Sequence, residues 1–199
     1  MRMITTIIFD IGGVFVKGSS ENFIKNASKM LGVNIRKDDI KKELWDDLMR
    51  GKISLQEFMS RAFGIPISDK KMEELIDLWI KNWKLDPEMV VFAKRFKPKY
   101  RLVMLSNVNR DGLKRSKNNL HFNFFDYKFL SFDLGLIKPE REIYEHVLKE
   151  IDARPEECVF IDDKPENVEA ARKLGIHGIV FQDKEQLKQD LKKIGVILE

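Results

Sequence analysis

The chain has few of the features that would assign it to a specialised class of protein. Its 199 residues include a single cysteine, Cys158, so no disulfide can form within the chain, and we expect a reducing, cytoplasmic location. No apolar run reaches the length of about eighteen residues that a membrane-spanning helix needs. The apolar run near the N-terminus is interrupted by threonines and by Asp10, which predicts a strand and not a signal peptide. With no internal repeat and no low-complexity segment, the chain has the pattern of an ordinary globular protein.

A strong excess of charge is also missing. The 36 lysine and arginine residues and the 32 aspartate and glutamate residues leave a net charge of +4, with both signs mixed along the chain. The densest basic stretch, residues 94–101, lies where a helix should end, and cations stabilise helix C-termini. The aromatic residues fall in apolar stripes and strands, whereas a nucleic-acid surface would alternate them with basic residues. We therefore expect neither nucleic acid nor a membrane as a partner.

Short apolar runs that are typical of buried strands occur at residues 4–9, 101–105, 127–130, 158–161 and 178–181. The later runs are separated by segments with helical punctuation. Pro139, Pro155 and Pro165 suit the first turn of a helix, and Gly175 suits the end of one. Because strands and helices alternate, we predict an α/β fold with a doubly wound, Rossmann-like parallel sheet.

One connection is too long for this pattern. Roughly ninety residues separate Asp10 from the second predicted strand, where a helical crossover needs about a dozen or somewhat more. The excess has helical periodicity, with apolar stripes in residues 23–31, 40–48, 55–62 and 72–83. Ser54 and Glu57 form a capping-box pattern at the start of the third stripe. We predict a helical cap domain at residues 17–84, inserted as a lid into an α/β core domain of residues 1–16 and 85–199.

Polar residues follow three of the predicted strands. Asp10 follows the first strand, Ser106 and Asn107 end the second, and Asp162 and Asp163 follow the fourth. In an open α/β sheet, ligands bind beyond the carboxyl ends of the strands, so these side chains should meet at one edge. Each of them alone could be an ordinary turn former or helix cap. Their coincidence at strand ends predicts a functional site.

A fourth polar group, Lys138, would be an ordinary surface lysine in isolation, but it lies within the sequence GLIKPE at residues 135–140. The other strand ends carry IFDIGGV at residues 8–14, LSN at 105–107 and FIDDKPEN at 160–167. In this order, the four motifs resemble the haloacid dehalogenase (HAD) superfamily. The resemblance is to its phosphatase-like branch of the subfamily IA type, with a helical cap after the first strand, and it covers essentially the whole chain.

The resemblance implies a phosphatase in which Asp10 attacks phosphorus and forms an aspartyl-phosphate, which splits hydrolysis into two easier steps. It implies that Lys138 places a fixed cation between this carboxylate and the phosphoryl oxygens. Ser106 and the backbone amides around Asn107 would hold the transferring group by hydrogen bonds. The implied catalytic residues are Asp10, Ser106 and Lys138, and the implied substrate-binding residues are Ser106, Asn107 and Lys138.

The resemblance also implies a Mg²⁺ site, held by Asp10, the backbone carbonyl of Gly12, Asp162 and Asp163. The ion would supply the positive charge that a carboxylate needs when it attacks a phosphate dianion. We expect Asn167, in the first turn of the helix after the acidic pair, to support or cap the site and not to bind the ion directly.

The sequence departs from the family pattern at Gly12. Relatives usually carry an aspartate there, which protonates the leaving group and later deprotonates water. General acid–base help of this kind is worth about 10² to 10⁴ in rate. The backbone carbonyl at this position is kept, so metal binding need not change. None of the three histidines, His121, His146 and His177, offers an obvious replacement acid.

We therefore expect a Mg²⁺-dependent phosphatase acting on a small phosphorylated metabolite, with two alternatives. One is a protein that binds phosphorylated ligands with weak or no turnover, because Gly12 replaces the acid. The other is a 2-haloacid dehalogenase, whose first motif also lacks the second aspartate but whose chemistry needs no metal. Arg50 and Lys52, in the turn before the Ser54 cap, are candidates for contacts to a distal anionic group of the substrate.

Overall fold

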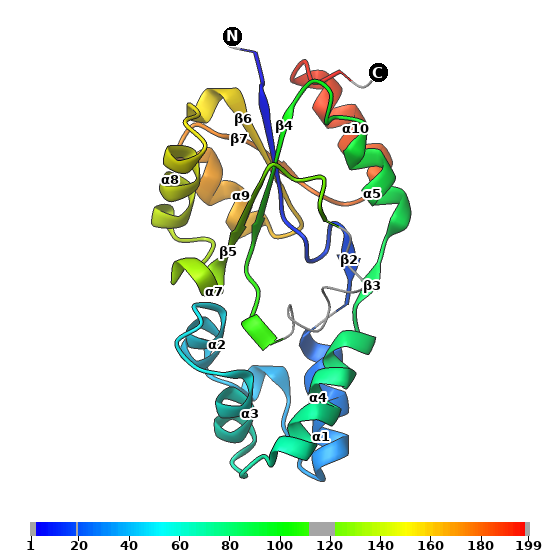
Figure 1. The fold of residues 1–199 in the computed structure, drawn as a ribbon, viewed down its shortest axis with the longest axis vertical. Helices are drawn as coiled ribbons and strands as arrows, with labels where there is room; N and C mark the ends of the chain where they lie inside the picture. Colours follow the sequence, from blue (N-terminus) through cyan, green and yellow to red (C-terminus); the bar gives the residue numbers. More distant parts are fainter. Residues whose placement is uncertain (1–2, 19, 112–121, 198–199) are drawn as a thin grey trace.

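The computed structural model describes residues 3–18, 20–111 and 122–197. Its centre is a five-stranded sheet in which every neighbouring pair is parallel (Figure 1). In spatial order the strands are β5 (Tyr127–Leu130), β4 (Arg101–Ser106), β1 (Thr6–Phe9), β6 (Cys158–Asp162) and β7 (His177–Val180). Each predicted strand is present, shifted by at most two residues at either end, and the predicted doubly wound α/β fold is confirmed.

Helices cover both faces of the sheet. Helices α5 (Pro87–Lys94) and α10 (Lys184–Lys193) pack on one face, and α8 (Arg141–Glu150) and α9 (Pro165–Arg172) pack on the other (Figure 1). Successive side chains of a strand point to opposite faces, so Ile7 and Phe9 join the first layer of core while Ile8 joins the second. Burial on both faces explains why the strands are continuous apolar runs without polar alternation.

A second group of helices lies at the other end of the molecule (Figure 1). It consists of α1 (Ser20–Leu31), the short 3₁₀ helix η1 (Lys37–Asp39), α2 (Lys42–Met49), α3 (Leu55–Phe63) and α4 (Asp69–Lys81). These helices bury an apolar cluster of their own. The predicted cap of α3 is present, because the Ser54 hydroxyl accepts from the Glu57 N–H at 3.1 Å. The predicted stripes run slightly past the helices, since Ile40 precedes α2 and Trp83 follows α4.

A short antiparallel ribbon joins the two groups of elements. Strand β2 (Val16–Lys17) pairs with β3 (Lys84–Leu85), so the chain enters and leaves the helical group at neighbouring points. The sequence does not reveal this ribbon, because two-residue strands are too short to show periodicity.

Two of the three prolines that were predicted in the first turn of a helix lie there. Pro155 and Pro165 occupy the first turns of η2 (Pro155–Glu157) and α9, as predicted. The prediction for Pro139 is wrong, since α8 begins only at Arg141 and Pro139 lies in the preceding turn. The helix α7 (Ser131–Leu134) follows β5 directly. No described helix is long and apolar enough to cross a membrane.

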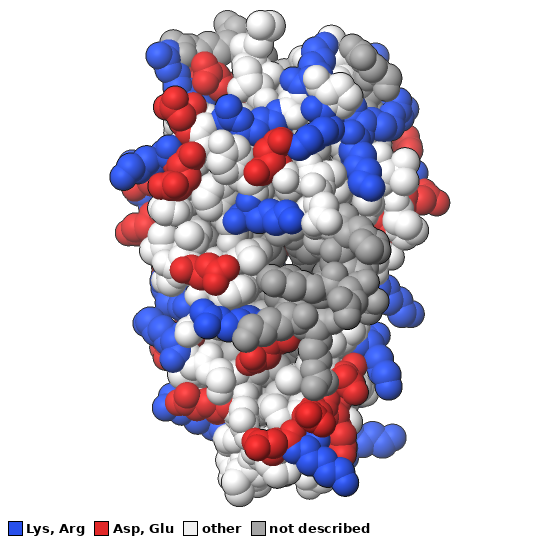
Figure 2. Space-filling model, viewed as in Figure 1, with Lys and Arg blue, Asp and Glu red and all other residues white. Residues whose placement is uncertain are grey.

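The surface carries both signs of charge. Figure 2 shows basic side chains gathered over the end of the molecule that holds the sheet, with acidic side chains among them. Several of these form exposed ion pairs within one helix, such as Arg141 with Glu145 of α8 at 2.7 Å. Exposed pairs of this kind stabilise a protein little.

Candidate active site

Asp10 lies at the carboxyl end of β1, the central strand of the sheet. Strands β4 and β6 flank β1 in register, with Phe9 opposite both Met104 and Ile161. The Asp10 N–H donates to the carbonyl of Ile161 at 2.9 Å, which fixes the backbone at this edge. The chain adds β4 and β5 on one side of β1 and then β6 and β7 on the other, so this edge is the switch point where α/β sheets bind ligands.

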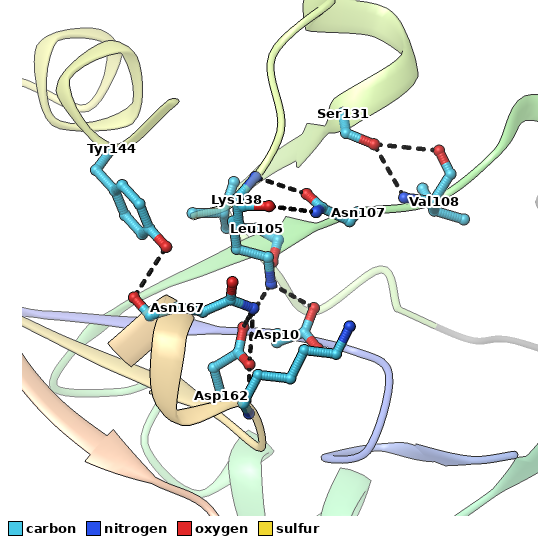
Figure 3. Close-up of polar contacts among 10 residues, drawn as sticks. Asp10, Leu105, Asn107, Val108, Ser131, Lys138, Tyr144, Asp162 and Asn167 are labelled. Atoms are coloured by element: carbon cyan, nitrogen blue, oxygen red, sulfur yellow. Dashed lines mark hydrogen bonds and ion pairs between the residues drawn. The ribbon is translucent and has the colours of Figure 1, made fainter. Parts of the chain in front are cut away.

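Lys138 projects into the same edge and is almost fully buried, with a side chain that is 1% exposed. Its Nζ lies 2.8 Å from Oδ1 of Asp10 and 2.6 Å from Oδ2 of Asp162, and it donates to the carbonyl of Leu105 at 3.0 Å (Figure 3). An ammonium group has three hydrogens, so these contacts use all of them. Burial alone would lower the pKa of Lys138, but the carboxylates of Asp10 and Asp162 raise it above its ordinary value. Lys138 is therefore a fixed cation at this edge.

Asp162 is held from several sides and is completely buried. Nδ2 of Asn167 lies 3.0 Å and 2.9 Å from its two carboxylate oxygens, and the Lys164 N–H donates to Oδ1 at 2.8 Å. The Tyr144 hydroxyl in turn donates to the backbone carbonyl of Asn167 at 2.9 Å (Figure 3). As predicted, Asn167 supports the acidic pair from the first turn of α9.

Three carboxylates converge beside this lysine. Oxygen atoms of Asp10, Asp162 and Asp163 all lie within 4.8 Å of one another. Burial raises the pKa of Asp10 to about 6, against the pull of Lys138 and with a contribution from the charge of Asp162. Burial and Asp162 also raise the pKa of Asp163. Three carboxylates facing one ammonium group are an oxygen-rich, negatively charged donor set, which fits a hard divalent cation such as Mg²⁺.

Two glycines after Asp10 have different roles. A Cβ built on Gly13 would lie 2.2 Å from the Asp163 side chain, and its φ of +77° also favours glycine. Gly12 has no such restriction, because among the described residues a Cβ there would meet only Oδ2 of Asp10, at 3.8 Å. The residue that replaces the family's usual aspartate is therefore not required to be glycine by the local backbone.

Ser106 and Asn107 lie beside Lys138. Ser106 ends β4 and is buried. Nδ2 of Asn107 donates to the backbone carbonyl of Lys138 at 2.9 Å, and the Lys138 N–H donates to Oδ1 of Asn107 at 3.0 Å (Figure 3). This pair of bonds fixes the backbone that carries the lysine. From the sequence, Asn107 was expected to hold the transferring group only through the backbone amides around it. The role of the Asn107 side chain was missed, because a contact between residues 31 positions apart leaves no local sequence pattern.

A cavity of about 770 Å³ lies between this sheet edge and the helical group. On the sheet side it is lined by Gly12, Ser106, Asn107 and Lys138, together with Asn167. On the helical side it is lined by residues of α1, α2 and α4, prominent among them Phe23, Trp45, Met49, Trp79 and Trp83. The sequence pattern placed Trp79 and Trp83 in the buried stripe of a helix, but both also face this cavity.

Residues 4–175 match the family model described as haloacid dehalogenase-like hydrolase. The chain belongs to this family. The family assignment confirms the resemblance that the four motifs indicate.

Two curated relatives match this hydrolase over nearly their whole length. The D-ribitol-5-phosphate phosphatase of Bacteroides thetaiotaomicron is 25% identical, with 96% of this chain and 98% of the relative covered. The sesquiterpene phosphatase astK of Aspergillus oryzae is 28% identical, with 94% of each covered. The chain also matches the drimenol cyclase drtB of Aspergillus calidoustus at 25% identity, but it spans only 37% of that longer protein.

A HAD family enzyme from Bacteroides thetaiotaomicron has the same fold. Its crystal structure superposes with a TM-score of 0.81 at 25% identity, covering 94% of this chain and 98% of that one. The magnesium complex of that enzyme superposes with a TM-score of 0.76, also at 25% identity. This relative of the hydrolase therefore binds magnesium.

The prediction for Arg50 and Lys52 is wrong, because neither is among the residues that line the cavity. Nη1 of Arg50 donates to the carbonyl of Gly135 at 2.9 Å, and Nη2 pairs with Glu140. Lys52 pairs with Asp47 of α2 at 3.2 Å. Arg50 thus fastens the turn after α2 to the loop that carries Lys138.

The described histidines do not supply the missing acid. His146 lies in α8, with its ring packed edge-on against Phe129 at 6.0 Å. His177 begins β7 and is in register with Val159, near the amino end of β6 and away from Asp162. Neither is among the residues that line the cavity. His121 lies outside the described residues.

Proposed function

We propose that the hydrolase is a Mg²⁺-dependent phosphatase of small phosphorylated molecules, with Asp10 as its nucleophile. The observation that carries the proposal is the position of Asp10. Its carboxylate lies at the switch point, touches the buried ammonium group of Lys138 and belongs to the cluster of three carboxylates. A nucleophile, a fixed cation and a metal donor set at one sheet edge are the components that phosphoryl transfer needs.

Hydrolysis would proceed in two steps at phosphorus. The Asp10 carboxylate attacks the phosphoryl group, the bond from phosphorus to the ester oxygen breaks, and the leaving group departs as an anion that takes a proton from solvent, while an aspartyl-phosphate forms. Water then attacks phosphorus, which regenerates the Asp10 carboxylate and releases inorganic phosphate. Lys138 offsets the negative charge on the phosphoryl oxygens, and Ser106 with the backbone N–H of Asn107 binds the transferring group.

The acidic cluster would hold the metal ion. Asp10, Asp162 and Asp163 with the backbone carbonyl of Gly12 would bind Mg²⁺, which supplies positive charge that Lys138 alone does not provide. Asn167 and the Lys164 N–H hold the Asp162 carboxylate in place through its two oxygens.

The absence of an acid at Gly12 limits which leaving groups the phosphatase should release quickly. Without an acid at this position, the leaving group must depart as an anion or be protonated by solvent. Leaving groups that form stable anions, such as phenols, should therefore be released readily. Ordinary alcohols should be released slowly.

We further propose that residues 17–84 form the cap of the enzyme. Their helices bury a separate apolar cluster, they are joined to the rest of the chain by the β2–β3 ribbon, and they close one side of the cavity. A cap in this position would exclude water from the phosphoryl group during attack by Asp10. A cytoplasmic location stays a prediction from the single cysteine.

The names of the relatives support a small phosphorylated substrate but do not indicate what its organic part is. One is named for D-ribitol 5-phosphate and the other for a sesquiterpene, so the organic parts of their substrates differ in polarity. The organic part that this enzyme accepts must be decided by its own cavity.

The proposal is tested by the hydrolysis of p-nitrophenyl phosphate in excess Mg²⁺ and in excess chelator. We expect release of inorganic phosphate only with the metal. Halide release from a 2-haloacid in chelator would instead support the dehalogenase. Binding of inorganic phosphate without any turnover, measured by calorimetry, would support a ligand-binding protein.

A further inference from the structure

All three tryptophans of the chain line the cavity at the candidate active site. Trp45 lies in α2, Trp79 in α4 and Trp83 just after α4. The rings of Trp79 and Trp83 are 5.8 Å apart, and the Trp79 ring meets that of Phe23 edge-on at 4.4 Å. We call Phe23, Trp45, Trp79 and Trp83 the aromatic wall.

The aromatic wall lies across the cavity from the polar groups of the sheet edge. Gly12, Ser106, Asn107 and Lys138 line the cavity where a phosphoryl group would lie, and the wall belongs to the helices on the other side. Charged residues also line the helical side, namely Lys37, Asp38, Lys41, Lys42 and Asp46, and of these Lys42 and Asp46 are paired with each other at 2.7 Å. Through Trp45 and Trp83, which are only partly buried, the wall offers a molecule in the cavity apolar and aromatic surface, opposite a polar and cationic end.

The cavity has room for a molecule that is larger than a phosphate ion. At about 770 Å³, it lies within the range of about 300 to 1,000 Å³ that is usual for pockets that bind drug-sized molecules. A polyol packed against the wall would lose hydrogen bonds from its several hydroxyl groups to water and could regain few, because each indole ring offers a single N–H donor and no acceptor. An aromatic ring would bury apolar area there and could form edge-to-face contacts with the tryptophans.

We propose that the preferred substrates are phosphate esters of bulky aromatic alcohols, whose ring system packs against the aromatic wall. This inference rests on the proposed phosphatase function and names its substrate class. Gly12 favours the same class for an independent reason, because phenolic leaving groups depart as stable anions and need no acid. The cavity and the chemistry of the site thus select one kind of leaving group.

The kinetic test compares 2-naphthyl phosphate with phenyl phosphate in Mg²⁺. The two leaving groups have similar acidity, so the difference between them reports on the extra ring and not on the chemical step. We expect kcat/KM to be about tenfold higher for the naphthyl ester. Equal values for the two esters, or faster hydrolysis of a polyol phosphate such as glycerol 3-phosphate, would overturn the proposal.

Variants of the wall assign the effect to its residues. Trp45→Leu and Trp83→Leu should each lower kcat/KM for 2-naphthyl phosphate more than for phenyl phosphate, and so remove most of the preference for the naphthyl ester. Both residues are only partly buried, so they are better choices than Trp79. Tyr127→Leu is the matched control, because Tyr127 is 39% exposed and begins β5 outside the cavity. A preference that survives both tryptophan substitutions would also overturn the proposal.

A binding measurement separates this inference from the proposed function. The Asp10→Asn variant should bind 2-naphthyl phosphate about tenfold more tightly than phenyl phosphate in calorimetry, whether or not the wild type turns over either ester. If no phosphate ester is hydrolysed but this difference is found, the phosphatase function fails and the aromatic site stands. If phenyl phosphate is hydrolysed and the two affinities are equal, the phosphatase stands and the aromatic site fails.

Discussion

Nζ of Lys138 lies 2.8 Å from Oδ1 of Asp10, in a site where the lysine side chain is 1% exposed and the aspartate side chain 10% exposed. The same Nζ contacts Asp162, which is completely buried. Lys138 thus holds Asp10, which we assign as the nucleophile. It also neutralises Asp162, a proposed metal ligand. Loss of the lysine would leave two carboxylates buried without a cation, which is far more harmful than loss of an exposed ion pair, whereas loss of the Asp10 charge would leave Lys138 paired with Asp162.

The first prediction concerns the stability that this lysine provides. Lys138→Ala should lower the free energy of unfolding by about 3 to 5 kcal/mol, because it leaves the carboxylates of Asp10 and Asp162 buried together without a cation. Urea denaturation near pH 7 measures this change in the free energy of unfolding. A chelator is present so that no metal ion replaces the lost charge. Lys149→Ala, on the exposed side of α8, is the control and should change little. A loss below about 1 kcal/mol for Lys138→Ala would contradict the buried network.

The second prediction concerns metal binding without any catalytic readout. Mg²⁺ should raise the melting temperature of the wild type, because a ligand that binds only the folded state stabilises it, by about 2.7 kcal/mol at a hundred times its Kd. Asp163→Asn should largely remove this increase, since Asp163 offers one of the three clustered carboxylates. The exposed Glu150→Gln serves as the control. An equal Mg²⁺ effect in Asp163→Asn and the wild type would place the ion elsewhere.

The third prediction concerns the missing acid. Gly12→Asp should be tolerated, because within the part of the chain that the structure describes a Cβ at this position meets only Oδ2 of Asp10, at 3.8 Å. The new carboxyl group would restore protonation of the leaving group, so it should raise kcat/KM for alkyl phosphates more than for aryl phosphates, by up to about a hundredfold.

The comparison for this prediction uses an alkyl and an aryl phosphate in both proteins. Gly13→Asp serves as the contrasting variant, since a Cβ there would lie 2.2 Å from Asp163 and should disrupt the site. A wild type that hydrolyses both classes equally fast would mean that another group already acts as the acid. Our account of Gly12 would then be wrong.

Most of the fold could be predicted from local sequence patterns. The strands appear as short apolar runs because the sheet is buried on both faces, and the carboxyl-end residues Asp10, Ser106 and Asp162 could be grouped because parallel strands end at one edge. The helical insertion was visible as excess length with helical periodicity. The Ser54 cap could be read directly, because the donor and the acceptor are three residues apart.

Other features depend on contacts that no local pattern records. The side-chain bonds from Asn107 to the Lys138 backbone and the link from Arg50 to Gly135 join residues 31 and 85 positions apart. The sequence suggested that Arg50 contacts a substrate, because it does not show which distant groups in the fold already bind the guanidinium group of an arginine in a turn. Trp79 and Trp83 fit a buried helical stripe, and only the arrangement of α4 over the sheet edge shows that they also face a cavity.

The central claim is that Asp10 is the nucleophile of a phosphatase, and the hydrolysis of p-nitrophenyl phosphate by Asp10→Asn tests it most directly. The substitution keeps the size of the side chain and removes the attacking carboxylate, so circular dichroism should show an intact fold. In saturating Mg²⁺, kcat/KM should fall by at least about a thousandfold from the wild-type value. If the purified variant keeps more than a few per cent of wild-type activity, Asp10 is not the nucleophile and the account is wrong.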